Sequence, residues 1–271
     1  MKIAISNLAW DHSEDSKVLK LLQKYNINAI EIAASKIWQD PVEVTDAKIN
    51  KCKNFWKKNG IEIVATTSLL FGHPELQIFA DRKAKNETFS YLSKMIELSV
   101  KLGAKAMVFG SPKNRVTNGK SKKEVEKISI EFFGKISKIA RKRNIYFGIE
   151  PNPPLYGTDF INTTDEAIKL VKKVNNSNFC VHLDTSTMTI NQENYLKTII
   201  QALPYTHHYH ISEPGLKPIP TEETDHKKVS NALKNSGYKD WVSIEMPLGP
   251  DIKHLEQIEK TLKFVNEVYA H

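Results

Sequence analysis

The sequence predicts a single domain, residues 1–271, folded as a (β/α)8 barrel. Eight short runs rich in β-branched residues alternate with longer segments whose apolar residues recur every three or four positions, and this alternation is the pattern of repeated βα units. The first connection, SNLAWDHSED, contains no glycine, whereas an open doubly wound sheet typically has a glycine-rich turn there. Eight units in a chain of this length are enough to close a barrel.

The eight expected strands follow one another at intervals of about one βα unit. They are residues 2–6, 27–32, 60–66, 104–110, 145–150, 179–184, 206–212 and 241–246. Helices are expected between them, because the intervening segments carry apolar stripes of helical period. In the first, fourth and last helices these stripes include Val18, Leu21, Leu22, Val125, Ile128, Phe132, Leu255, Ile258 and Leu262. Long loops follow the third, fourth, fifth and seventh strands, at the barrel end where catalytic residues lie.

The composition is that of a soluble globular chain, with 40% hydrophobic and 26% charged residues. No apolar run approaches the roughly 20 residues that cross a bilayer, and the amino-terminal stretch MKIAISNLAW lacks the long apolar region of a signal peptide. We therefore expect a cytoplasmic protein with no membrane partner. Cys52 and Cys180 occupy apolar positions without CxxC spacing, so buried free thiols are expected.

The formal net charge of +8 raises the question of an anionic partner. The lysines are spread through helical segments such as KINKCKNFWKKNG rather than gathered in one arm, which favours a solvated basic surface. No specific nucleic-acid partner is expected, although an anionic substrate remains open. A homo-oligomer is possible, and the sequence does not decide it.

Four consecutive expected strands each end in a potential metal ligand. These residues are Glu150, Asp184, His210 and Glu245, and about one βα unit separates each from the next. They should therefore meet at one rim of the barrel. Carboxylates gathered in a half-buried ring repel one another unless a cation lies among them. Three oxygen donors and one imidazole without a thiolate predict one divalent ion, Mn²⁺ in the first place, with Mg²⁺, Co²⁺ or Zn²⁺ as alternatives.

The stretch HHYHISEP places three histidines where a strand usually carries Val or Ile. Side chains alternate along a strand, so His208 should point into the barrel together with His210. By the same parity, His182 should lie inside below Asp184. We expect His182 and His208 to support the metal ligands by hydrogen bonding, and the alternative is a pair of core histidines without a role in the site.

Several loop residues are candidates for binding a substrate. Lys113 and Arg115 follow the fourth strand and suit a phosphate or carboxylate, unless they belong to a solvated basic turn. Asn152 and Tyr156 follow the fifth strand, within reach of a polyol. His73 and Glu31 are equally consistent with substrate contact and with rim structure.

The motifs GIEPNP, VHLDTST, YHISEP and VSIEMP, together with SNLAW and GIEIVAT, resemble those of the xylose isomerase-like TIM-barrel superfamily over the whole chain. This resemblance implies an isomerase: a sugar or sugar-phosphate epimerase or isomerase that transfers a proton next to a carbonyl through a metal-stabilised enediolate. In the 3-epimerase-like members the glutamates that match Glu150 and Glu245 bind the ion and also act as the two acid–base groups. Such a mechanism is chemically sound, because an ion bound by carbonyl and hydroxyl oxygens acidifies the C–H bond between them.

The chain also departs from the patterns of this superfamily. Ketose 3-epimerases usually carry a histidine at the position of Thr187 and an arginine where this chain has Lys217, which is therefore a candidate substrate ligand. Endonuclease IV-like members need additional zinc-binding histidines, for which only His73, Asp225 and His226 are possible remnants. A keto-polyol dehydratase resembling inosose dehydratase, an endonuclease IV-like phosphodiesterase and a non-catalytic binding protein remain as alternatives, in that order.

Overall fold

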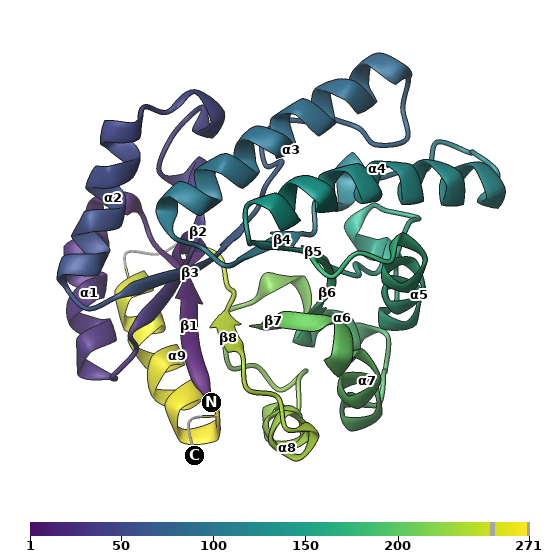
Figure 1. Ribbon diagram of the computed structural model, residues 1–271. Helices are drawn as coiled ribbons and strands as arrows, with labels where there is room; N and C mark the ends of the chain where they lie inside the picture. Colours follow the sequence, from purple (N-terminus) through teal and green to yellow (C-terminus); the bar gives the residue numbers. More distant parts are fainter. Residues whose placement is uncertain (250–252, 270–271) are drawn as a thin grey trace.

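All eight expected strands form, and their parallel pairing closes a barrel in the order β1 to β8, with β8 paired to β1 (Figure 1). The computed structural model describes residues 1–249 and 253–269. The strands are β1 Lys2–Ser6, β2 Ala29–Ala33, β3 Glu62–Thr67, β4 Ala106–Phe109, β5 Tyr146–Ile149, β6 Phe179–Asp184, β7 Thr206–Ile211 and β8 Trp241–Ile244. The (β/α)8 prediction is confirmed, and the strand boundaries agree with those expected to within two residues.

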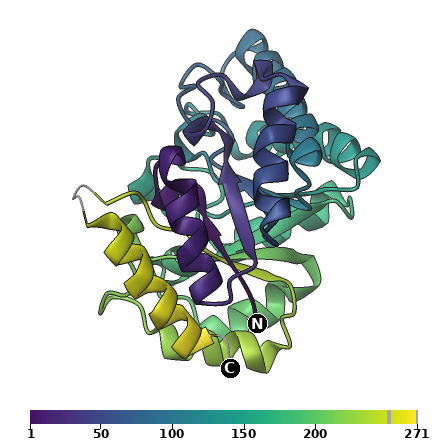
Figure 2. The same cartoon turned by 90° about the vertical axis from the view of Figure 1, so that its left-hand side faces the viewer.

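Helices surround the barrel. They are α1 Asp15–Lys24, α2 Asp46–Lys58, α3 Arg82–Leu102, α4 Lys122–Lys142, α5 Thr164–Val174, α6 Thr185–Ile190, α7 Tyr195–Ala202, α8 His226–Ser236 and α9 His254–Tyr269. Local sequence fixes several of their ends: Ser121 and Thr163 begin α4 and α5 with capping boxes, and Gly103 ends α3 in the left-handed conformation. Figure 2 shows α9 beside α1, where Lys24 and Glu259 form an ion pair of 2.5 Å.

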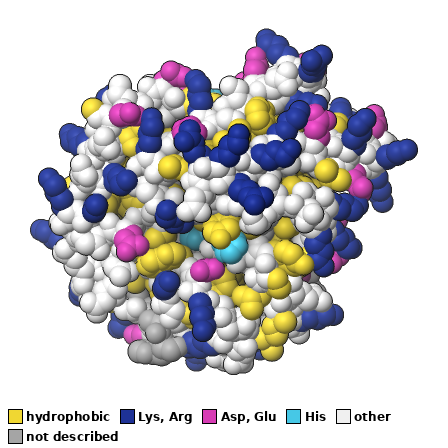
Figure 3. Space-filling view, viewed as in Figure 1, with side chains coloured by type: hydrophobic (Ala, Val, Ile, Leu, Met, Phe, Trp, Pro, Cys, Tyr) yellow, Lys and Arg dark blue, Asp and Glu magenta, His cyan; other side chains and the backbone are white. Residues whose placement is uncertain are grey.

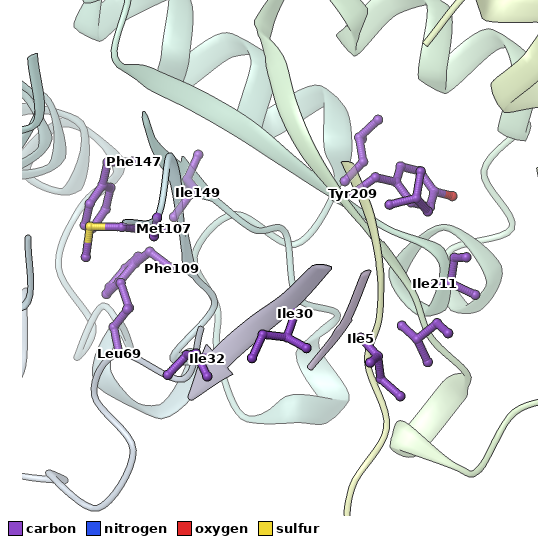
Figure 4. Packing of buried hydrophobic residues seen from close by; sticks show 14 of the residues in the cluster. Ile5, Ile30, Ile32, Leu69, Met107, Phe109, Phe147, Ile149, Tyr209 and Ile211 are labelled. Atoms are coloured by element: carbon purple, nitrogen blue, oxygen red, sulfur yellow. The ribbon is translucent and has the colours of Figure 1, made fainter. Parts of the chain in front are cut away.

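The main hydrophobic core lies between the strands and the helices. Outward-facing residues of neighbouring strands pack side by side (Figure 4), as with Ile5 of β1 and Ile30 of β2, which are paired in register. Phe109 and Phe147 stack with ring centroids 5.5 Å apart. Burial of apolar surface in this layer is the main force that holds the helices to the barrel.

The interior of the barrel differs between its two halves. On the side of β1 to β4 it is filled by a cluster of small residues, which consists of Ala4, Ala29, Val64, Ala65 and Ala106. The strands β6 and β7 contribute the much larger imidazoles of His182, His208 and His210, all of them buried. The small residues of one half leave room for the large polar side chains of the other half. The inner strand faces therefore provide a polar site inside an apolar shell.

Cys52 and Cys180 are buried and free, as predicted, and burial raises the pKa of both thiols to about 12. Both are therefore protonated at neutral pH and unreactive. Among the described residues, no helix has the length and apolar character needed to span a membrane.

Candidate metal and active site

The four predicted metal ligands converge at the carboxyl ends of β5 to β8. Asp184 is the last residue of β6, and His210 lies within β7. Glu150 and Glu245 directly follow β5 and β8. One donor atom of each residue lies within 4.8 Å of the donor atoms of the other three. The Nδ1 atom of His210 is 3.5 Å from Glu150 Oε1 and 3.3 Å from Glu245 Oε2. We call these four residues the quartet.

The quartet concentrates negative charge in a buried place. Burial raises the pKa of Asp184 to about 7, and the charges of Glu150 and Glu245 add to this rise. Burial also raises the pKa of Glu245, against the attraction of His210. The His210 Nδ1 atom is buried and has no hydrogen-bond partner among the described residues. A divalent cation would neutralise the carboxylates and take the lone pair of this nitrogen, so the donor set fits one such ion.

Glu31 fixes the orientation of His210. This glutamate of β2 is completely buried, and its carboxylate accepts hydrogen bonds from His208 Nε2 at 2.7 Å and His210 Nε2 at 3.0 Å. Burial alone would raise the pKa of Glu31, but the two imidazoles outweigh it and lower that pKa to about 2. Because a carboxylate only accepts, both imidazoles donate through Nε2, and Nδ1 is the nitrogen of His210 that faces the quartet. Sequence reasoning missed this role of Glu31; its inward position at the end of a strand was the available signal.

The two inner histidines behave differently from each other. His208 supports the quartet indirectly, since it shares Glu31 with His210. Neither ring nitrogen of His182 forms a hydrogen bond within the part of the chain that the structure describes, and its Nε2 atom lies 3.5 Å from Glu150 Oε1. Burial and the neighbouring imidazoles lower the pKa of His182 well below its usual value, so its ring is neutral. The hydrogen-bonding role expected for His182 is therefore not present in the structure.

Two hydroxyl-bearing residues hold Asp184. The Oδ1 atom of Asp184 accepts a hydrogen bond from the Thr187 backbone N–H at 2.7 Å, and its Oδ2 atom accepts one from the Ser212 hydroxyl. The hydroxyl of Thr187 donates to the carbonyl of Pro151 at 2.8 Å. Thr187 thus links α6 to the loop after β5.

Arg115 lies behind the site and does not line it. Its guanidinium is completely buried and donates to the backbone carbonyl of Glu150 at 2.7 Å and to Asn152 Oδ1 at 2.6 Å. Asn152 in turn donates to Glu150 Oε2 at 3.0 Å. Arg115 therefore orients a predicted metal ligand through Asn152. The expectation that Arg115 contacts an anionic substrate does not match its position, because its side chain is completely buried and it is not among the residues that line either cavity at this end of the barrel.

A cavity of about 240 Å³ opens beside the quartet. Glu150, Asp184 and Glu245 line it. Its remaining wall consists of the predicted residues Asn152 and Tyr156 together with Thr67, Ser68, Gly110, Ser111, Pro112, Ser186 and Leu216. No lysine or arginine is among these lining residues. A larger cavity of about 920 Å³ lies near the opposite barrel end, beside Lys2 and Trp241, away from the end where barrels carry chemistry.

The remaining predicted substrate ligands lie farther out. His73 and Lys113 line an adjoining cavity of about 370 Å³, which shares Ser68, Ser111 and Pro112 with the cavity beside the quartet. Lys217 is exposed and pairs with Glu223, and it is not among the residues that line either cavity. Figure 3 shows one face of the molecule with basic side chains scattered over it. His73 and Lys113 are therefore placed for the distal part of a ligand, whereas Lys217 is not.

Tyr156 connects three segments around the cavity. Its hydroxyl lies 3.0 Å from the Ser186 hydroxyl and accepts a hydrogen bond from the Gly215 backbone N–H at 2.9 Å. The loops after β5 and β7 and the first turn of α6 are thereby joined next to Leu216, which also lines the cavity. Tyr156 thus forms part of the cavity wall, with its hydroxyl bonded to protein groups.

The possible remnants of a zinc cluster do not come together. His73 pairs with Glu75 at 3.0 Å, and His226 lies between Glu213 and Tyr269 at 2.8 and 2.7 Å. Asp225 caps the first turn of α8. Within residues 1–249 and 253–269, none of the clusters of potential metal ligands includes His73, Asp225 or His226. The geometry gives no support to a three-zinc phosphodiesterase.

The sequence profile described as xylose isomerase-like TIM barrel matches residues 19–268. The chain belongs to this family. The D-psicose 3-epimerase of Ruminiclostridium cellulolyticum is 26% identical to it over 259 residues, which cover 90% of this chain and 83% of that protein. This relative and a second one, described as a probable ketose 3-epimerase, support the expectation of an isomerase-class enzyme.

Solved structures agree on the fold. A crystal structure of D-psicose 3-epimerase with D-tagatose from Clostridium cellulolyticum H10 has a TM-score of 0.81 and 21% identity, and the match covers 99% of both chains. A structure described as IOLI protein with a bound zinc atom has a TM-score of 0.73 and 20% identity, with 100% of both chains covered. At these identities the likeness establishes a shared barrel architecture.

Proposed function

We propose that this protein is a divalent-metal-dependent sugar epimerase or isomerase. The observation that carries the proposal is the position of Glu150 and Glu245, two carboxylates that belong to one potential ion site and line one small cavity. A sugar held in that cavity by the ion would meet both carboxylates. The similarity to ketose 3-epimerases supports the same class of reaction.

The quartet of Glu150, Asp184, His210 and Glu245 would hold the ion, with Mn²⁺ as the first expectation because oxygen donors outnumber nitrogen donors. When bound, the ion would polarise adjacent carbonyl and hydroxyl oxygens of the sugar and acidify the C–H bond between them. Glu31, Ser212 and Asn152 would keep the imidazole and two of the carboxylates in place through the hydrogen bonds described above.

Glu150 and Glu245 would move the proton. In an epimerisation one carboxylate removes the proton from one face of the carbon, and the other returns a proton to the opposite face. Burial raises the pKa of Glu245, so its protonated form is available at a higher pH than for an exposed glutamate, which suits a group that must also act as an acid.

The cavity favours an uncharged substrate at the reacting end. Thr67, Ser68, Ser111 and Ser186 line it, and the described residues that line it include no lysine or arginine. Hydroxyls of this kind match the hydroxyls of a polyol. A substrate that carries a phosphate would have to place it in the adjoining cavity beside Lys113.

The test is an isotope experiment on ketoses with Mn²⁺-loaded enzyme in D₂O. Transfer through Glu150 and Glu245 places solvent deuterium at the reacting carbon, which NMR detects. Glu150→Gln or Glu245→Gln should each lower the rate by about 10² to 10⁴, since an amide cannot accept the proton. Glu43→Gln at the exposed surface is the matched control.

Three results would contradict parts of the proposal. Complete conversion without deuterium uptake would remove the two-carboxylate assignment. A product that has lost water would favour the dehydratase alternative. Unchanged metal content in an Asp184→Asn, His210→Asn double variant would remove the ion site.

A further inference from the structure

His182 is a buried imidazole whose bonding is incomplete. Its side chain is 1% exposed, and neither Nδ1 nor Nε2 has a hydrogen-bond partner among the described residues. A buried polar group without a partner destabilises a fold, and in native structures almost all such groups are satisfied by protein, water or an ion. His182 therefore requires a partner that is not a protein side chain.

The neighbouring strand leaves space for the His182 side chain. Gly148 lies on the neighbouring strand β5, and a Cβ atom at this position would come within 3.2 Å of the His182 Cβ atom. A glycine in the interior of a strand often marks such a close approach. The His182 ring also lies against that of His210, with centroids 4.1 Å apart. The absence of a side chain at Gly148 thus makes room for the imidazole beside the quartet.

The distances around His182 are those of metal ligands. Its Nε2 atom and His210 Nδ1 each lie 3.5 Å from the same oxygen, Glu150 Oε1. Two donors that bind one ion at about 2.1 Å with a tetrahedral angle lie about 3.4 Å apart. Glu150, His182 and His210 form a second group of potential metal ligands. This group shares Glu150 and His210 with the quartet.

We propose that Glu150, His182 and His210 form an inner cation position next to the quartet. The Nδ1 atom of His210 has a single lone pair and can bind only one ion. One ion therefore occupies either the inner position or the quartet, and the two sites are not filled together. Two imidazoles and one carboxylate favour nitrogen-preferring ions such as Cu²⁺ and Zn²⁺, whereas the three carboxylates of the quartet favour Mn²⁺ and Mg²⁺. The identity of the ion then selects its position, and a nitrogen-preferring ion binds away from Asp184 and Glu245.

Pulsed electron paramagnetic resonance tests this directly, because it counts the imidazoles bound to a paramagnetic ion. Wild-type protein loaded with one equivalent of Cu²⁺ should show two coordinated imidazoles, and the same protein loaded with Mn²⁺ should show one. His182→Leu should reduce the Cu²⁺ count to one and weaken Zn²⁺ binding by at least about tenfold. Its Mn²⁺ affinity should change less than about threefold.

His226→Leu is the matched control, since His226 is also buried but bonds to Glu213 and Tyr269 outside the quartet. It should keep two imidazoles on Cu²⁺. One coordinated imidazole in the Cu²⁺-loaded wild type would overturn the inner position and leave a buried water as the partner of His182. This comparison of two ions in the wild type needs no variant to fold. The inference rests on the ion site of the proposed function, and failure of that site is distinguishable, because neither ion would then bind through His210.

Discussion

His210 donates its Nε2 hydrogen to Glu31 across the barrel, over a distance of 3.0 Å. The two residues lie on β7 and β2, far apart in the sequence but both on the inner face of the barrel. This bond turns the other ring nitrogen toward Glu150 and Glu245. In metal-free protein that nitrogen tends to carry a proton: burial alone would lower the pKa of His210, but Glu31 and Glu245 raise it well above its usual value. A metal ion therefore competes with a proton for His210.

Glu31→Gln should weaken metal binding. The amide presents a donor as well as an acceptor, so it can hold His210 in the wrong tautomer, with its Nδ1 hydrogen directed at the quartet. Loss of such a supporting carboxylate typically lowers metal affinity by about 10- to 100-fold. Competition with a chromophoric chelator measures the affinity. Glu62→Gln, at the exposed start of β3, is the control, and equal affinities in the two variants would contradict the role of Glu31.

Gly110→Ala should displace Glu150 without unfolding the protein. A methyl group there would lie 2.3 Å from Glu150 Oε2, and the obstructing atom is the end of a side chain that can turn away. We expect metal affinity to fall by about tenfold or more, with little change in the melting temperature. In Gly134→Ala, where nothing lies within 4 Å of the added methyl group, affinity should persist and stability should rise by about 0.5 to 1 kcal/mol. Intact metal binding in Gly110→Ala would show that Glu150 tolerates displacement.

Asp184 should make the metal-free protein less stable as the pH rises. Its pKa is raised from 3.8 to about 7 in the folded chain, so between these values the folded state holds a proton that the unfolded state has released. The protonated Asp184 side chain therefore contributes its full share of stability below a pH of 3.8. This contribution declines as the pH rises toward about 7, the pKa in the folded chain. Urea unfolding with a chelator present should show wild type losing stability relative to Asp184→Asn over this window. Excess Mn²⁺ should stabilise the wild type most at high pH. The prediction would be refuted if the free energies of unfolding of the two metal-free proteins differed by the same amount at every pH.

Abasic duplex DNA should not be cleaved, even with zinc supplied. His73 and His226 lie in separate hydrogen-bonded pairs, and the lysines and arginines are scattered over the face shown in Figure 3. Any binding to DNA should weaken steeply between low and physiological salt, as non-specific phosphate contacts do. Gel assays for incision and fluorescence anisotropy over a salt series measure both. Site-selective incision would require a reassignment of function.

The sequence was sufficient for the barrel and the quartet because both follow from short periodicities. Strand alternation and the spacing of βα units place Glu150, Asp184, His210 and Glu245 at one rim, and the four meet there. The hydrogen bond between Glu31 and His210 could not be predicted in the same way. It joins two residues that are far apart in the sequence, and local patterns of residues do not indicate such contacts across the barrel interior.

Arg115 and Lys217 illustrate a second limit. Both are cationic residues in polar loops, and the sequence gives no sign of whether a loop folds inward or outward. Arg115 folds inward and is completely buried, while Lys217 extends to Glu223 at the surface. Whether each side chain is buried or exposed depends on its partners in the folded structure and not on its neighbours in the chain.

The two faces of each strand differ in what an amino-acid substitution there would affect. Outward side chains such as Phe109 and Phe147 attach the helices, whereas inward side chains such as His182 and His208 surround the site. A mutation at an inward position can alter ion preference or substrate fit while leaving the contacts between strands and helices intact. New specificity is therefore accessible through inward substitutions that preserve the folded scaffold.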